Sequence, residues 1–159
     1  MKIINLSQGK QTLVDDADFD YLVQWKWHAI HYKDTGLWYV SRVLKHKVTA
    51  MHRLIMNCPT GMQVDHIDGD GLNNQRYNLR ICTKDENNIN KRVRKDNTSG
   101  YKGVTWNKKS KKWIAQIKSK KIHYLLGSFD NPEEAYKAYC KSAKELHGEF
   151  SRLITDKKL

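Results

Sequence analysis

Apolar and polar residues alternate along the first fifty positions, a period that predicts short β-strands. Four strands are expected, over residues 2–6, 11–14, 25–29 and 38–42, with turns at 7–9 and 34–36. Acids from Asp15 to Asp18 begin a short helix between the two pairs, with Phe19, Leu22 and Val23 on one face. Residues 1–50 are therefore expected to form a β-rich segment with its Trp side chains in the core.

The middle of the chain carries both helical and strand periods. The expected elements are a short helix over 51–56, strands over 62–66 and 79–82 around a polar loop at 68–74, and a helix over 84–90. Thr83 is the expected N-cap of the last helix, with Glu86 three residues on. Residues 51–90 thus read as a hairpin closed by a helix.

The last third predicts a second module after a basic linker at 91–99. Three strands are expected over 100–106, 112–118 and 122–127, then a helix that ends at Gly148. Asn131 is its N-cap, Pro132 its first residue and Glu134 completes a capping box. Its apolar stripe is Ala135, Tyr139, Ala143 and Leu146. The fold class expected is α+β, with a three-stranded antiparallel sheet packed on one helix over residues 100–153.

Charge is concentrated in this last third. The 159 residues include 29 Lys and Arg against 17 Asp and Glu, a net charge of +12. Residues 91–126 hold ten Lys and two Arg against one acid, Asp96, which gives +11 and leaves +1 for the rest of the chain. A basic excess confined to one segment predicts a polyanionic partner bound there.

Composition limits the setting. A hydrophobic fraction of 39% predicts several small cores in place of one large core. The three Cys lack CxxC spacing, which favours free thiols in a reducing compartment. The sequence has no apolar run of membrane-spanning length and no signal-peptide core, so we expect a soluble intracellular protein with no membrane partner.

Acidic, imidazole and amide side chains recur at fixed spacing in the middle segment. Asp65 and His66 are followed by Asn78, twelve residues after the His, and by Asn87, twenty-two after the Asp. A carboxylate is a hard ligand for a divalent cation, and an imidazole accepts a proton from water at neutral pH. Singly, Asp65 or Asn78 would read as a turn-capping residue. The spaced set indicates a hydrolytic site.

These residues carry a resemblance to a known family. Residues 51–90 resemble the HNH nuclease unit, the ββα-metal fold of phage and intron homing endonucleases, through His52-Arg53-Leu54, Asp65-His66, Asn73-Asn74, Asn78-Leu79-Arg80 and Cys82-Thr83-x-x-Glu86-Asn87. The resemblance implies that His66 is the general base and that Asn78 orients it. It also implies that Asp65 and Asn87 bind one divalent cation. Because Asn87 stands where the motif often has His, the oxygen pair favours Mg²⁺ or Mn²⁺ over zinc. His52 and Arg53 are candidate supporting residues.

The last third resembles a second family. Residues 97–152 are similar to the three-stranded, Apetala-type DNA-binding domain of plant ethylene-response factors, through Ser99-Gly100-Tyr101-Lys102-Gly103-Val104, Trp113-x-Ala115-x-Ile117, Leu126-Gly127-x-Phe129, Glu134-Ala135-x-x-Ala138-Tyr139 and Ala143-x-x-x-His147-Gly148-Glu149-Phe150. The resemblance implies a sheet in the DNA major groove with its other face on the helix. Alternation turns Trp113, Ala115 and Ile117 towards the helix. The expected DNA contacts are Lys102, Thr105, Asn107, Gln116, Lys118 and Tyr124, with Lys91, Arg92 and Arg94 in the linker.

Together these features predict a metal-dependent, site-specific endonuclease of the homing type that acts on double-stranded DNA. The main alternative is a non-catalytic DNA-binding protein with a vestigial nuclease fold. An RNA-cleaving role comes third, because its mark is exposed aromatic rings for stacking and the expected exposed positions are mostly polar. The phage and bacterial occurrence of the resembled family implies the cytoplasm of a bacterium or of a phage-infected cell.

Overall fold

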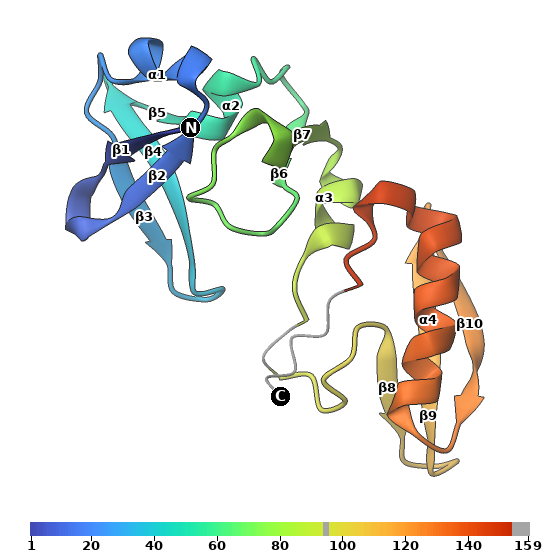
Figure 1. The fold of residues 1–159 in the computed structure, drawn as a ribbon. Helices are drawn as coiled ribbons and strands as arrows, with labels where there is room; N and C mark the ends of the chain where they lie inside the picture. The colour runs from blue at the N-terminus through green and yellow to red at the C-terminus, as the bar shows by residue number, and fades with distance from the viewer. Residues whose placement is uncertain (94–95, 154–159) are drawn as a thin grey trace. The chain divides into compact units, whose positions relative to one another are not determined.

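The computed structural model describes residues 1–93 and 96–153 (Figure 1). Over these residues the fold is α+β, with short helices and small antiparallel sheets. The chain divides into two compact units, Met1–Asn87 and Asn88–Leu159, called unit 1 and unit 2 below. Within the described residues, no helix combines the length and the apolar character needed to cross a bilayer.

Unit 1 begins with a hairpin and a three-stranded sheet. Its elements are β1 (Lys2–Asn5), η1 (Ser7–Gly9), β2 (Gln11–Val14), α1 (Asp16–Leu22), β3 (His28–Tyr32), β4 (Leu37–Leu44), β5 (Lys47–Ala50), α2 (Met51–Ile55), β6 (Gln63–His66), η2 (Arg76–Asn78), β7 (Leu79–Cys82) and α3 (Lys84–Asn90), the last of which runs into unit 2. β1 pairs with β2, the second sheet has the order β3-β4-β5, and β6 pairs with β7.

The second sheet differs from the prediction at both ends. β3 begins at His28, three residues after the expected start, because Trp25 and Trp27 pack edge-on to each other before the strand. β5 was not predicted at all. Lys45 and His46 turn the chain with φ of 46° and 63°, a tight-turn conformation usually signalled by Gly or Asn. Neither residue occurs at positions 45 and 46, so the turn that leads into β5 could not be predicted from the sequence.

One core joins the N-terminal segment to the predicted nuclease hairpin. Its buried members are Ile4, Val14, Leu22, Trp27, Val40, Met51, Ile55, Val64 and Leu79. Residues on both sides of position 50 contribute to it, so the expected division there does not separate two cores. Val23, expected on the apolar face of the first helix, is 46% exposed because the helix ends at Leu22.

The N-terminal strands also hold the loop between β6 and β7. Leu13 N donates to Leu72 O at 3.0 Å, and Asn74 N donates to Leu13 O at 2.9 Å, a parallel bridge between β2 and the loop. Gly71 lies against β4, where an added Cβ would come 2.2 Å from Trp38 O and 2.7 Å from the Tyr39 ring. Only glycine allows this approach of loop to sheet.

Unit 2 is a sheet with one long helix along it, as Figure 1 shows. Its strands are β8 (Val104–Asn107), β9 (Lys112–Ser119) and β10 (Ile122–Phe129), in the order β10-β9-β8, followed by α4 (Pro132–His147) and η3 (Gly148–Phe150). Asn131 caps α4 as predicted, its side chain accepting from Glu134 N at 2.8 Å. Ala135, Tyr139 and Ala143 are buried as expected, but Leu146 is 39% exposed and Tyr136 packs inward in its place.

Candidate functional site

The β6–β7 hairpin gives the candidate site two faces. Its register is regular up to His66, the last residue of β6. Successive side chains on a strand point to opposite faces, so Gln63 and Asp65 share one face, while Val64 and His66 share the other. His66 is the last residue of β6, so the Asp-His pair lies at the end of the strand.

Asp65 is paired with an arginine across the hairpin. Nε and Nη2 of Arg80 donate to Asp65 Oδ2 at 2.9 and 2.7 Å. The side chains of Arg80 and Asp65 are 11% and 6% exposed, so the ion pair is shielded from water. Burial, with the Asp65 carboxylate nearby, raises the pKa of the Cys82 thiol to about 11. Asp65, the predicted metal ligand, is thus already paired with the positive charge of Arg80.

Asn87 lies over the face of the hairpin that carries Asp65. The predicted capping box fixes the start of α3, because Thr83 N donates to Glu86 Oε2 at 2.7 Å and Glu86 N donates to Thr83 Oγ1 at 3.2 Å. One turn further on, Asn87 Nδ2 donates to Gln63 Oε1 at 2.7 Å. Gln63 and Asp65 share a face, so this hydrogen bond brings the amide of Asn87 to the same side as the carboxylate.

The donor chemistry on this face fits a hard cation. Asn87 uses Nδ2 for Gln63, which leaves its Oδ1 as the atom for a further contact. Within residues 1–93 and 96–153, no three His, Cys, Asp or Glu side chains cluster as a metal site. One carboxylate and one amide oxygen suit Mg²⁺ or Mn²⁺, which keep several waters and take phosphate oxygens. The ligand roles of Asp65 and Asn87 stay predictions.

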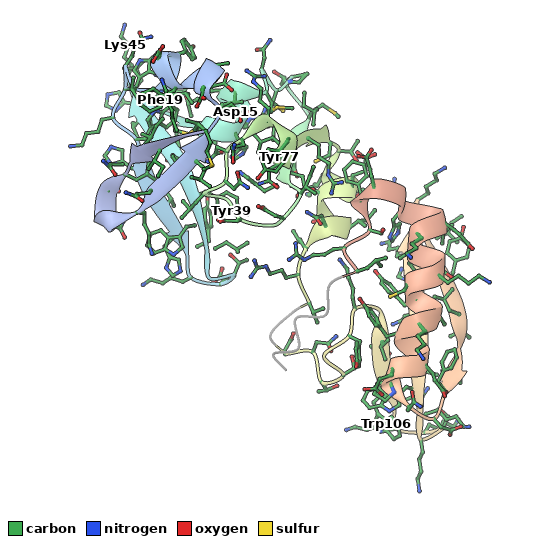
Figure 2. All side chains as sticks on the ribbon, viewed as in Figure 1. Asp15, Phe19, Tyr39, Lys45, Tyr77 and Trp106 are labelled. Atoms are coloured by element: carbon green, nitrogen blue, oxygen red, sulfur yellow. The ribbon has the colours of Figure 1, made fainter. Side chains whose placement is uncertain are left out.

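The imidazole of His66 lies on the opposite face and is 4% exposed. Its Nε2 is 3.4 Å from Asn74 Oδ1. The rings of His52 and Tyr39, the latter labelled in Figure 2, stand edge-on to it with centroid distances of 5.0 and 5.8 Å. Burial lowers the pKa of His66, while the hydrogen bond to Asn74 and the carboxylates of the loop, Asp68 first, oppose the shift. The ring is therefore neutral at pH 7, the form that accepts a proton.

His52 and Arg53, the candidate supporting residues, point in different directions from α2. His52 packs on His66, and its buried Nδ1 has no hydrogen-bond partner in the described part of the chain. Burial, together with the charges of His66 and Arg53, lowers the pKa of His52 to about 3. Arg53 Nη1 donates to Met62 O at 2.7 Å and so holds the chain just before β6.

Asn78 holds the loop that follows His66. Its Oδ1 accepts from Asp68 N at 3.0 Å, and its Nδ2 donates to Asp68 Oδ1 and Asn73 O, both at 2.9 Å. Its backbone carbonyl accepts from Ile67 N, directly after His66, at 2.9 Å. The side chain of Asn74 contacts the imidazole. The orienting role of Asn78 stays a prediction, and in this structure it would act through the loop.

The outer face of the unit 2 sheet, away from α4, is polar and basic. Directly paired residues share a face, and the ladders place on this side Thr105, Asn107, Lys112, Ile114, Gln116, Lys118, His123 and Leu125. The predicted DNA contacts Thr105, Asn107, Gln116 and Lys118 are exposed there. Asn107 Oδ1 also accepts from Lys109 N and Ser110 N, at 3.0 and 3.1 Å, so it holds the β8–β9 turn. Trp106, labelled in Figure 2, packs with Trp113 on the other side.

Tyr124 does not lie where the sequence placed it. It pairs with Ile117, which is 3% exposed and belongs to the core with α4, so Tyr124 is on the helix side of the sheet. The register shifts between Leu125 and Gly127. A bulge adds one residue and reverses the alternation before it. Leu125, 72% exposed and opposite Gln116, takes the outer position instead.

The remaining predicted DNA contacts belong to the basic linker and its surroundings. Lys91 and Arg92 are exposed. Lys102 Nζ donates to the backbone carbonyls of Ile89 and Lys91, which hold the ammonium group without neutralising its charge. Arg94 lies outside the described residues.

Comparison with known proteins agrees with both halves of this description. An HNH endonuclease family model matches residues 50–89, and an AP2 domain model matches residues 99–149. Protein 3.8 of Escherichia phage T7 is 37% identical over 94 residues, which cover 59% of this chain and 77% of that protein. This chain belongs to the family of phage T7 protein 3.8 and combines an HNH endonuclease domain with an AP2 domain.

A further relative supports the HNH assignment. An uncharacterised HNH endonuclease of Acanthamoeba polyphaga mimivirus is 32% identical over 93 residues, 58% of this chain and 47% of that protein. The chain thus spans about three quarters of the phage relative and less than half of the mimivirus relative. No solved structure matches the chain. The HNH match covers α2 to α3 and the AP2 match covers β8 to α4, so DNA is the partner class for both domains.

Sequence reasoning missed three residues at the HNH domain. Asn74 and Arg80 were noted only as members of the motifs Asn73-Asn74 and Asn78-Leu79-Arg80, with no role of their own. Thr12 was not noted as a functional residue. Thr12 lies 62 positions before Asn74, whose Nδ2 donates to Thr12 Oγ1 at 2.9 Å. No local pattern signals a contact over that separation. An Arg opposite an Asp on a predicted hairpin was a readable signal, because cross-strand pairs of opposite charge stabilise sheets.

The buried Asp65–Arg80 ion pair predicts that removing the guanidinium of Arg80 lowers stability strongly. Arg80→Met removes the guanidinium that pairs with the buried Asp65 carboxylate, so the free energy of unfolding of unit 1 should fall by about 3–5 kcal/mol. The control is Asp20→Asn, which breaks an exposed pair with Lys2 and should cost less than about 1 kcal/mol. Urea denaturation followed by Trp fluorescence measures both. Equal, small losses would contradict a buried ion pair.

His52 predicts a dependence of stability on pH. The unfolded state binds a proton at His52 below about pH 6.5, and the folded state binds it only near the lowered pKa of about 3. The stabilisation is therefore complete above pH 6.5 and is lost as pH falls towards 3, by up to about 1.4 kcal/mol per pH unit. His52→Phe should flatten this slope in urea denaturation series, while His46→Asn at the exposed β4–β5 turn should not. An unchanged slope in the Phe variant would refute it.

Proposed function

We propose that the protein is a metal-dependent, site-specific DNA endonuclease of the homing type. The observation that carries the proposal is the buried imidazole of His66 at the end of β6, beside Asn74 Oδ1 and within a matched HNH domain. An AP2 domain with a basic outer face on the same chain supplies affinity for DNA. A viral relative described as an HNH endonuclease supports the nuclease part of the proposal.

His66 takes the proton of the attacking water. Its neutral ring has a lone pair available at pH 7, and the loop carboxylates stabilise the imidazolium that forms. The water oxygen bonds to phosphorus and the bond to the 3′ oxygen breaks. The 3′ oxygen takes a proton from solvent, which leaves a 5′ phosphate and a 3′ hydroxyl. Asn78 keeps the loop in place during this step through Asp68 and Asn73.

Asp65 and Asn87 would hold the divalent cation, Mg²⁺ or Mn²⁺. Bound there, the ion would stabilise the charge that grows on the phosphate and on the leaving oxygen. The ion pair with Arg80 holds the buried Asp65 carboxylate in place. A cation can bind Asp65 Oδ2 only if Arg80 gives up at least one of its two hydrogen bonds to that oxygen. We therefore expect weak cation binding in the absence of DNA.

The outer face of the AP2 domain sheet positions the duplex. Basic side chains of this face and of the linker bind phosphates, with Lys118 from the sheet and Lys91 and Arg92 from the linker. Gln116 is exposed with an amide that both donates and accepts hydrogen bonds, which suits it to read base edges. Sequence preference therefore belongs to unit 2 and chemistry to unit 1.

A non-catalytic DNA-binding protein is the second candidate. The Asp65–Arg80 pair favours it, because the guanidinium occupies a carboxylate oxygen that a cation needs. The two candidates differ in one measurable property, which is breakage of the DNA backbone.

Cleavage of supercoiled plasmid in Mg²⁺ or Mn²⁺ separates these candidates. Wild-type protein should nick or linearise the DNA, and His66→Ala should lower the rate by about 10²- to 10⁴-fold because the general base is removed. Gel-shift affinity should stay unchanged in His66→Ala. His46→Asn, with Asn tolerating the left-handed turn, is the matched control and should cut normally. A wild type that shifts DNA and never cuts it, under either cation, supports the binding-only protein.

Cation binding has its own readout. Mg²⁺ or Mn²⁺ should raise the thermal unfolding midpoint of the DNA-free protein, because a ligand that binds only the folded state stabilises it. Asp65→Asn and Asn87→Ala should abolish this shift, and Asp20→Asn, 90% exposed, should keep it. A shift that survives both substitutions would place the cation elsewhere.

A further inference from the structure

Three buried side chains form a hydrogen-bonded line that ends at the imidazole of His66. Thr12 lies on β2, Asn74 in the loop between β6 and β7, and His66 at the end of β6. Asn74 Nδ2 donates to Thr12 Oγ1 at 2.9 Å, and Asn74 Oδ1 faces His66 Nε2 at 3.4 Å. Thr12 and Asn74 are 0% exposed and His66 4%. This burial shields the hydrogen bond between Thr12 and Asn74 from solvent.

The direction of the line is fixed at its far end. Thr12 Oγ1 donates its single proton to the carbonyl oxygen of Leu72 at 2.6 Å, and a carbonyl can only accept. The hydroxyl oxygen therefore accepts from Asn74. The second acceptor of the Asn74 amide nitrogen is Gly71 O at 3.3 Å, again a carbonyl. Both acceptors face the same atom of the Asn74 amide, so that atom is the nitrogen, Nδ2. The other atom, Oδ1, therefore points to the ring of His66.

An amide oxygen carries no proton, so the ring nitrogen that faces it has to supply one. Only one nitrogen of a neutral imidazole bears a hydrogen, and the hydrogen bond made by that nitrogen selects the tautomer. With Nε2–H committed to Asn74, the lone pair is on Nδ1. An amide held by three partners imposes this choice more firmly than a mobile side chain does.

We propose that Thr12 and Asn74 are positioning residues that hold His66 in its Nε2–H tautomer, so that Nδ1 is the atom that receives the water proton. The inference rests on the proposed function, in which His66 is the general base. Asn74 Oδ1 then gains a charge-assisted hydrogen bond when the imidazolium forms. Through Thr12, the β1–β2 hairpin helps to position the proposed general base. This hairpin lies outside residues 50–89, which the HNH model matches.

The tautomer is measured directly, with no reaction. Long-range ¹H–¹⁵N correlation spectra of the full-length, ¹⁵N-labelled protein distinguish the protonated from the unprotonated ring nitrogen, and His66→Ala identifies the signals. Wild type should show Nε2–H at a pH where the ring is neutral. Thr12→Val keeps the shape and removes the hydroxyl, so a second tautomer should appear. Thr12→Ser keeps the hydroxyl and should retain the single Nε2–H form.

The plasmid assay supplies a second readout. Thr12→Val should lower the maximal nicking rate by about tenfold, the lower range for loss of a group that orients a reactive His, with DNA affinity unchanged. Thr12→Ser should restore the rate.

Wild-type His66 as the Nδ1–H tautomer, or a Val variant with an unaltered tautomer, overturns the inference. The wild-type spectrum decides alone if the Val variant does not fold. A third outcome separates the two proposals. If the Nε2–H form is present and changes in Thr12→Val, but the protein never cuts DNA, the hydrogen-bonded line is supported and the proposed nuclease function is wrong.

Discussion

The loop between β6 and β7 is polar and buried, and the site depends on each of its buried amides having a partner. Asn73, Asn74 and Asn78 are 8%, 0% and 2% exposed. A buried amide without partners costs about 1–3 kcal/mol for each group left unpaired. These amides bond to the loop backbone, to Asp68 and to Thr12, so the chain around them has few alternatives. That restriction keeps His66 at the strand end with its ring directed inwards.

The N-terminal residues complete this network. Asp15 accepts from Gln75 Nε2 at 3.1 Å and from Arg76 N at 2.8 Å, and Asp18 accepts from the Arg76 guanidinium at 2.8 and 2.6 Å. The acids at the start of α1 therefore also hold the end of the loop between β6 and β7. With the bridge from Leu13 and the shared core, they make residues 1–87 one compact unit. A nuclease hairpin of forty residues has too little apolar surface to fold alone, and this arrangement supplies the rest.

The sequence predicts what is local and misses what is distant. The caps at Thr83 and Asn131 are short-range hydrogen bonds, and both are present as expected. The failures have identifiable causes, which are a turn at Lys45 without Gly or Asn and a bulge that reverses the alternation at Tyr124. At the candidate site, the spacing predicts Asp65, His66, Asn78 and Asn87 as functional residues but does not predict their hydrogen-bond partners. Thr12 is invisible to any local pattern, since its role comes from the fold.

The central claim is that β2 and the loop form one rigid support for His66. Native-state hydrogen exchange of the backbone amides of Leu13 and Asn74 tests it most directly, because both donate across this junction. The account predicts that the two amides exchange only through global unfolding of unit 1, with the same free energy as the amides of the central strand β4. Exchange as fast as that of the exposed β3–β4 turn would contradict it, since the loop would then open while the core stays folded.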